Sequence, residues 1–174
     1  MDNLETKRLL LRPWRTDDLG GLLRLMVTPE VMRYIGSRTT RSREETERDH
    51  AAKLAHWRRH GFGARAAIVT DTGEWIGYIL LQFVPPGVPG LDPADVEIGW
   101  LLKPSAWGQG FATEGARALR DEAFTRIGLD RLVARYQSEN EASGRIMEKI
   151  GMHFDRETIN SYGHAIRIYS IDRR

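Results

Sequence analysis

Cysteine is absent from the 174-residue sequence, which excludes disulfide bonds, thiol nucleophiles and cysteine-bound zinc. No apolar run approaches the roughly 20 residues that a helix needs to cross a bilayer, and the first residues show no secretory pattern. Lys and Arg total 26 against 24 for Asp and Glu, and a formal charge of +2 gives no indication of a nucleic-acid partner. We therefore expect a single cytoplasmic domain, residues 1–174, that binds neither membrane nor nucleic acid.

Hydrophobic periodicity and turn residues predict the order of strands and helices. The one strand-helix-strand unit should be a right-handed crossover between parallel strands, with antiparallel pairing elsewhere. This predicts an α/β (or α+β) fold with a mixed, mostly antiparallel central sheet. Strands are expected at 7–14, 64–70, 75–84, 95–102, 131–136 and on both sides of Tyr162–His164, and helices from a Thr16 cap, at 42–61, 110–128 and 140–150.

The most informative stretch is Trp100–Gly115, in which an apolar strand leads through a glycine-rich turn directly into a helix. Gly108 and Gly110 allow close approach of the backbone to a ligand, and the amides of a helix start suit an anion such as a pyrophosphate. Phe111 and Ala112 stand where a nucleotide P-loop has Lys and Ser or Thr, which disfavours a nucleoside triphosphate. The residues alone leave open that the glycines only shape a tight turn.

Residues 107–115, WGQGFATEG, resemble the CoA-binding loop of the GCN5-related N-acetyltransferases (GNAT), whose pattern is Arg/Gln-x-x-Gly-x-Gly/Ala. Gly110 and Ala112 fit the last two fixed positions, whereas Trp107 stands where Arg or Gln is usual. That departure is typical of the branch that resembles the ribosomal-protein N-terminal acetyltransferases. The similarity extends over almost the whole chain, from LETKRLLLRPW near the start to NEASGRIMEKIGM near the end.

The resemblance implies a GNAT fold with helices on both faces of the sheet, acetyl-CoA as co-substrate, and a primary amine as acceptor, either a protein N-terminus or a small molecule. Asn140 and Ser143 match the family's Asn-x-x-Ser positions near the pantetheine and the thioester, although the residues alone also fit a helix N-cap and an ordinary first-turn residue. The resemblance further assigns backbone pairing with pantetheine to Leu101 and Leu102, and pyrophosphate binding to Gly108, Gln109, Gly110, Phe111, Ala112 and Thr113.

Direct attack by the amine needs no protein nucleophile, so the missing cysteine is no obstacle to this chemistry. A backbone N–H near Trp100 or Leu101 is the expected donor to the developing oxyanion. Glu97 is the expected base, acting through a water; the alternative is that it only pairs with a basic residue or orients an amine. Met147 stands where the family often has a general-acid tyrosine, which leaves Ser143 or solvent to protonate the thiolate.

The long helix predicted before Gly61 carries two further patterns. His56 and His60 are four residues apart, but Trp57 replaces the Glu of a His-Glu-x-x-His zinc motif, and no metal is expected. Interleaved arginines and acidic residues favour a solvated helix face. Trp57, Tyr34 and Trp14 could line an acceptor pocket or belong to the core.

Two function classes remain open from the sequence: an N-acetyltransferase and a catalytically silent domain that binds CoA as a sensor or subunit. Both would bind the cofactor, but only the enzyme would release CoA when an acceptor is present. The sequence identifies neither the acceptor nor the oligomeric state.

Overall fold

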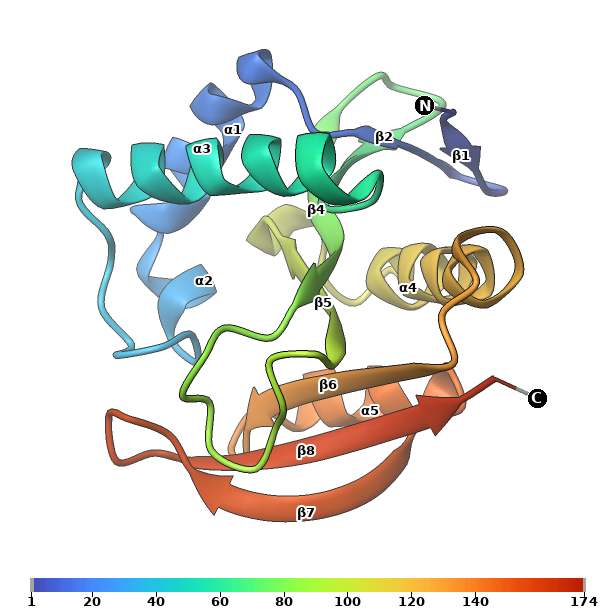
Figure 1. Ribbon diagram of the computed structural model, residues 1–174. Helices are drawn as coiled ribbons and strands as arrows, with labels where there is room; N and C mark the ends of the chain where they lie inside the picture. Colours follow the sequence, from blue (N-terminus) through green and yellow to red (C-terminus); the bar gives the residue numbers. More distant parts are fainter. Residues whose placement is uncertain (1, 174) are drawn as a thin grey trace.

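Eight strands join into one sheet in the order β1-β2-β3-β4-β5-β6-β8-β7 in the computed structural model, which describes residues 2–173 (Figure 1). The β5–β6 pair is parallel and the other neighbouring pairs are antiparallel, as predicted. The strands are β1 Leu4–Glu5, β2 Leu9–Pro13, β3 Arg65–Val69, β4 Trp75–Phe83, β5 Val96–Leu102, β6 Arg131–Gln137, β7 His153–Ile159 and β8 Ala165–Asp172. The helices are α1 Leu19–Met26, α2 Pro29–Met32, α3 Arg43–His60, α4 Phe111–Glu122 and α5 Glu141–Lys149.

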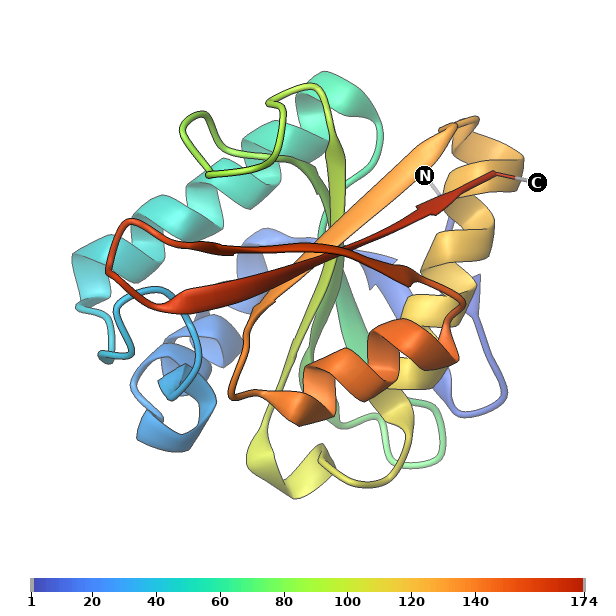
Figure 2. The same cartoon turned by 90° about the horizontal axis from the view of Figure 1, so that it is seen from below.

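The helices cover both faces of the sheet, which confirms the expected architecture: α1 and α3 lie together on one face, with α4 and α5 on the other (Figures 1 and 2). One core cluster packs beneath α4 and α5 and includes Ile79 and Met147. A second cluster packs beneath α1, α2 and α3 and includes Leu22 and Leu80. No helix within residues 2–173 is long and apolar enough to cross a membrane.

The start of the first helical region differs from the prediction. Thr16 begins a short 3-10 turn, and the residue at its N-cap position is Arg15. Asp18 supplies the acceptor that was expected from Thr16: its carboxylate accepts from the Arg15 N–H at 2.7 Å and pairs with Arg12 at 2.7 Å. A carboxylate satisfies the exposed N–H groups of a helix start better than a hydroxyl when a guanidinium also neutralises it. The two-residue strand β1 was not predicted from the sequence.

The long helix α3 begins and ends as predicted. The Ser42 hydroxyl accepts from the Glu45 N–H at 3.2 Å, and the Glu45 carboxylate accepts from the Ser42 N–H at 2.7 Å, which is a reciprocal capping box. Gly61 ends the helix with φ at 73°, a left-handed conformation that costs glycine little.

Most of the charged residues of α3 form the expected solvated face, whereas a second face of the helix is buried. Thr46, His50, Lys53 and Trp57 are buried, and their spacing of four, three and four residues places them on one stripe. This stripe packs toward the sheet, where the Trp14 indole N–H donates to His50 Nδ1 at 3.0 Å. Burial lowers the pKa of His50, in keeping with a neutral ring that accepts this hydrogen bond.

Candidate active site

Two adjoining cavities open beside β5, with volumes of about 570 Å³ and about 240 Å³. They are called here the larger and the smaller cavity. Strands β5 and β6 share a single bridge, Glu97 with Val133, so the two parallel strands separate beyond that point and leave one edge of β5 unpaired. The residues that line both cavities are Tyr34, Ile35, Trp100, Leu101, Asn140 and Ser143. The cavities therefore meet at the open edge of β5 and the start of α5.

The pairing register decides which backbone groups of β5 face this open edge. The Lys103 N–H donates to the Ile76 carbonyl at 2.8 Å, which makes these two residues a hydrogen-bonded pair of the β4–β5 ladder. Hydrogen-bonded and non-hydrogen-bonded pairs alternate along an antiparallel ladder. The backbone groups of Leu101 therefore turn to β4, whereas those of Trp100 and Leu102 turn to the open edge. Backbone pairing with pantetheine had been predicted for Leu101 and Leu102. The register supports Leu102 and favours Trp100 in place of Leu101.

The glycine-rich loop places a helix start at the larger cavity. Gly108 and Gly110 have φ angles of 72° and 82°, and Gly110 is the N-cap of α4. The first helical hydrogen bond of α4 runs from the Glu114 N–H to the Gly110 carbonyl. The N–H groups of residues 111–113, in the first turn of α4, precede this bond and have no partner within the helix. This geometry supplies clustered N–H donors and the positive end of the helix dipole to an anion.

Arg8, which the sequence analysis did not single out, holds this loop from outside. Its guanidinium donates to the Gln109 carbonyl at 2.9 Å and to Glu114 at 2.7 Å, and lies 4.6 Å from the centre of the Phe111 ring. Thr6 donates to the same carboxylate at 2.7 Å. Burial alone would raise the pKa of Glu114, but the hydrogen bonds from Thr6 and Arg8 outweigh it and lower the pKa. The segment that carries Thr6 and Arg8 therefore holds a loop that lies about a hundred residues further along the chain.

The structure brings together nearly all residues predicted for the cofactor. Gln109 is not among the lining residues of the larger cavity, because its carbonyl turns to Arg8. Arg33, Arg145 and Lys149 also line this cavity and add positive charge suited to phosphate groups. No sequence motif had indicated these three cations. The predicted residues that line the larger cavity are Leu101, Leu102, Gly108, Gly110, Phe111, Ala112, Thr113, Asn140 and Ser143.

The start of α5 contributes the two polar groups at the junction of the cavities. The Asn140 side chain makes no cap hydrogen bond; its amide donates instead to the Ser143 hydroxyl at 3.1 Å. Asn140 thus occupies the N-cap position of α5, as the residues alone suggested, while its side chain is turned to Ser143. A Cβ atom on Gly144 would lie 2.6 Å from the Tyr136 hydroxyl, so a larger residue there would require the Tyr136 side chain to move. Met147 is buried below these groups and lines the smaller cavity.

Glu97 lines the smaller cavity and is 8% exposed. Its carboxylate accepts from Arg135 Nε at 2.9 Å and from the Gln82 amide at 3.3 Å. The structure thus contains the pairing with a basic residue that was the alternative interpretation of Glu97. A role as base stays a prediction, because a positioned carboxylate can both pair with arginine and accept a proton relayed by water.

The opposite wall of the smaller cavity comes from α3 and the segment before it. Lys53 donates to both oxygens of Asp49, at 2.8 Å and 2.9 Å, and lies 5.0 Å from the centre of the Tyr78 ring. Arg41 approaches Asp49 less closely, at 3.9 Å. Burial lowers the pKa of Lys53, opposed by Asp49, and burial also raises the pKa of Tyr78. The sequence analysis did not identify this wall, because it depends on how α3 packs against the sheet.

Of the aromatic residues considered for an acceptor pocket, Tyr34 lines both cavities. Trp14 and Trp57 are 4% exposed and belong to the core beneath α1 and α3. The Trp57 indole N–H donates to the Ala64 carbonyl at 2.5 Å, so its polar atom is used within the fold.

The histidine pair of α3 has a structural role. His56 Nδ1 lies 2.9 Å from the Phe62 carbonyl, and the Phe83 N–H donates to His56 Nε2 at 3.3 Å. Because Nε2 is the acceptor, the neutral ring carries its proton on Nδ1 and joins the end of α3 to β4. Within residues 2–173 there is no group of three or more His, Asp or Glu side chains that could hold a metal ion.

Comparison with protein families and curated proteins gives consistent matches. The family model described as "Acetyltransferase (GNAT) domain" matches residues 8–153. The chain is 31% identical over 172 residues to the uncharacterized protein YkkB of Bacillus subtilis (strain 168), covering 95% of this chain and 93% of that protein.

Solved structures agree with this match. An acetyltransferase from Agrobacterium tumefaciens strain C58 superposes with a TM-score of 0.83 at 31% identity, covering 99% of this chain and 95% of that one. RimL, a ribosomal L7/L12 alpha-N-protein acetyltransferase solved in complex with coenzyme A, superposes with a TM-score of 0.79 over 99% and 98% of the chains. Because the two sequences are only 18% identical, this superposition shows a shared fold and nothing more.

Proposed function

This chain belongs to the GNAT family of acetyltransferases and transfers the acetyl group of acetyl-CoA to an amine, and we propose that the amine enters through the smaller cavity. The observation that carries this proposal is the junction at Trp100, Asn140 and Ser143, which both cavities share. A cofactor in the larger cavity would present its reactive end at this junction, where an amine from the smaller cavity can meet it.

The larger cavity suits acetyl-CoA in both shape and charge. Backbone amides from residue 108 to 113 are assigned to the pyrophosphate, and Arg33, Arg145 and Lys149 add charge for the phosphates. The open edge of β5 offers the backbone of Trp100 and Leu102 to the pantetheine amides in the manner of an added strand.

Acetyl-CoA supplies an acetyl group activated as a thioester, which the amine takes by direct attack while CoA leaves as a thiol. Glu97 removes the proton of the bound ammonium through a water, and its bonds to Arg135 and Gln82 fix the direction of its carboxylate. The Ser143 hydroxyl, which Asn140 orients, returns a proton at the sulfur. The N–H of Trp100 donates a hydrogen bond to the carbonyl oxygen of the thioester, which becomes negative when the amine attacks.

The acceptor is a primary amine, and the volume of the smaller cavity, about 240 Å³, favours a small molecule over a folded protein surface. The action of RimL on a ribosomal protein belongs to that protein, because a shared fold does not transfer a substrate. The absence of cysteine favours a reducing compartment, and we place the enzyme in the cytoplasm.

Release of free CoA thiol from acetyl-CoA in the presence of amines tests this function directly. The cysteine-free chain adds no thiol background to the assay. Glu97→Gln should lower turnover by roughly a hundredfold, a common loss for a general base, and most strongly below the pKa of the acceptor amine. Its affinity for acetyl-CoA, measured by calorimetry, should stay within about twofold, since Glu97 lies outside the larger cavity.

Glu47→Gln is the matched control, because Glu47 is a half-exposed α3 carboxylate that pairs with Arg43 and lines neither cavity. Unchanged turnover of Glu97→Gln across pH would remove Glu97 from the mechanism. Acetyl-CoA binding without thiol release for any amine would instead support the CoA-binding sensor.

A further inference from the structure

The smaller cavity carries an excess of positive charge within the described residues 2–173. Its charged lining consists of three cations, Arg41, Lys53 and Arg135, and two carboxylates, Asp49 and Glu97. A cavity with low-dielectric walls strengthens the field of such a set of charges. The net balance therefore favours an acceptor that contributes negative charge.

The pairing within the cavity shows where this excess lies. Arg135 pairs with Glu97 at 2.9 Å, and Lys53 pairs with Asp49 at 2.8 Å. Arg41 is held less closely: its nearest carboxylate is Asp49 at 3.9 Å, and its side chain makes no hydrogen bond to another of residues 2–173. A guanidinium with its donors available is a good partner for a carboxylate, because two parallel N–H groups match the two oxygens.

The two ends of the smaller cavity differ in chemistry. Glu97 and Ser143, on β5 and α5, lie at the end where the acetyl group is transferred. Arg41 and Lys53 come from α3 and the segment before it, across the cavity. An acceptor whose amine points to Ser143 would thus present the rest of its structure to the cations. The volume of about 240 Å³ is below the 300–1,000 Å³ common for drug-sized ligands.

Building on the proposed function, we propose that the acceptor is a small primary amine that also carries a carboxylate, with the carboxylate bound by Arg41 and the amine directed to the acetyl group. The reaction keeps its balance: the nitrogen forms an amide bond, the thioester C–S bond breaks, CoA takes one proton and one is released. Polyamines and aminoglycosides are disfavoured, because they would add positive charge beside three cations.

A matched panel of amines tests this class. Each of the proteinogenic amino acids is compared with its own amide, alongside spermidine and a neutral tetrapeptide, by release of CoA thiol. At least one free amino acid should be acetylated about tenfold more efficiently, in kcat/KM, than its amide, since a charge-assisted hydrogen bond distinguishes them. Arg41→Gln should reduce this preference to about twofold or less and raise KM for the amino acid rather than KM for acetyl-CoA.

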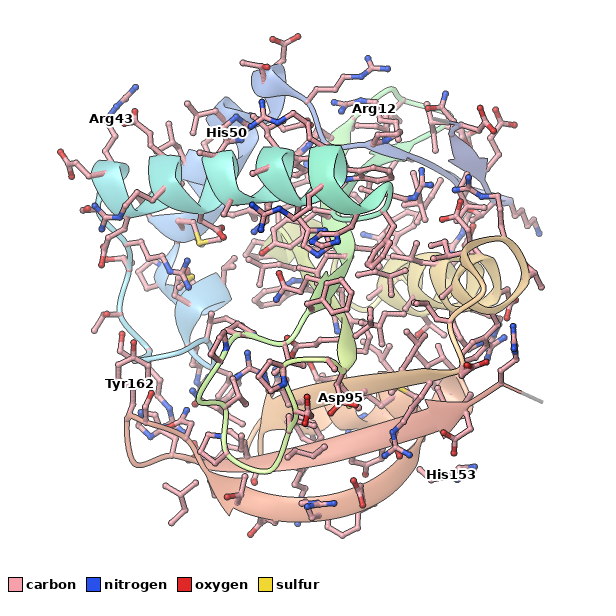
Figure 3. All side chains as sticks on the ribbon, in the orientation of Figure 1. Arg12, Arg43, His50, Asp95, His153 and Tyr162 are labelled. Carbon is pink, nitrogen blue, oxygen red and sulfur yellow. The ribbon has the colours of Figure 1, made fainter. Side chains whose placement is uncertain are left out.

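Arg43→Gln provides the control, because Arg43 points away from α3 into solvent (Figure 3) and is 68% exposed. It should leave both kinetic constants unchanged. Preference for an amide, spermidine or the tetrapeptide, or an unaltered acid preference in Arg41→Gln, would overturn the proposed acceptor while leaving the acetyltransferase function intact. No thiol release with any amine, despite acetyl-CoA binding, would overturn the proposed function itself.

Discussion

The glycine-rich loop and the smaller cavity are built in opposite ways. The loop is contiguous, residues 107–115, and offers backbone N–H groups whose directions follow from two left-handed glycines and a helix start. The smaller cavity collects side chains from α3, β4, β5, β6 and α5. Backbone-based binding can be read from the sequence because glycine positions encode it, whereas side-chain-based binding depends on which distant residues the fold brings together.

The largest expected effect on acetyl-CoA affinity comes from breaking the backbone geometry of the loop. Gly110→Ala places a Cβ on a residue with φ of 82°, where the added atom would also lie 3.4 Å from Arg8 Nη2. The left-handed conformation costs a non-glycine residue about 1–2 kcal/mol, so the loop should shift. We expect acetyl-CoA affinity to fall by roughly tenfold or more in calorimetry.

Gly128→Ala is its matched control at the other end of the α4 region. Gly128 has φ of 81°, and a Cβ there would meet nothing within 4 Å. The variant should lose similar stability but keep its affinity for acetyl-CoA. Equal loss of affinity in both variants would show that general destabilisation, and not the loop, is responsible.

An intermediate effect is expected where the two regions meet. Ser143→Ala removes the hydroxyl to which Asn140 donates at 3.1 Å. We expect kcat to fall by about tenfold with little change in acetyl-CoA affinity, which is less than the roughly hundredfold minimum typical of a general acid, because water can also protonate the thiolate. Ser161→Ala, exposed in the β7–β8 turn, is the comparison. A full kcat in Ser143→Ala would assign protonation of the thiolate to solvent.

The smallest effect tests how far the loop depends on distant contacts. Glu114→Gln weakens the ion pair with Arg8 at 2.7 Å and should cost about 1 kcal/mol, because the pair is only partly shielded from water. Acetyl-CoA affinity should fall no more than about threefold. Denaturant unfolding and calorimetry measure the two quantities.

This stability difference should depend on pH with a defined sign. The pKa of Glu114 in the folded chain is below its ordinary value of 4.5, so its ionised form stabilises the fold above that value. The contribution is lost as the pH falls through the folded pKa. The difference between the native chain and Glu114→Gln should be full at neutral pH and shrink below about pH 4.5. A stability difference that grows in acid would contradict a stabilising ion pair between Glu114 and Arg8.

Much of the fold could be predicted because the deciding residues are neighbours in the chain. The capping box of Ser42 and Glu45 and the stop at Gly61 bounded α3 correctly. The failures have a common cause. Asp18 replaced Thr16 as the acceptor at a helix start because Arg12, from a strand, lies beside it. The buried stripe around His50 was not predicted, because nothing in the local sequence shows that the sheet covers it.

The residues of the candidate site also differ in whether local sequence could identify them. The loop glycines, Asn140, Ser143 and Glu97 could be named from the sequence, through motif resemblance and strand position. Neither Arg8 nor Arg41 could be found, because their roles depend on residues far along the chain or on a cavity wall.

The sequence by itself determined the order of the main strands and helices, the caps of α3 and the glycine-rich backbone loop, since these follow from interactions within a few residues. Only the tertiary structure decided the pairing of Glu97 with Arg135, 38 residues away, and the facing of α3 toward β5 across the smaller cavity. The physical reason is that the sequence contains many possible partners for each charged side chain. Burial of the two core clusters fixes how the elements pack, and this packing decides which pair forms.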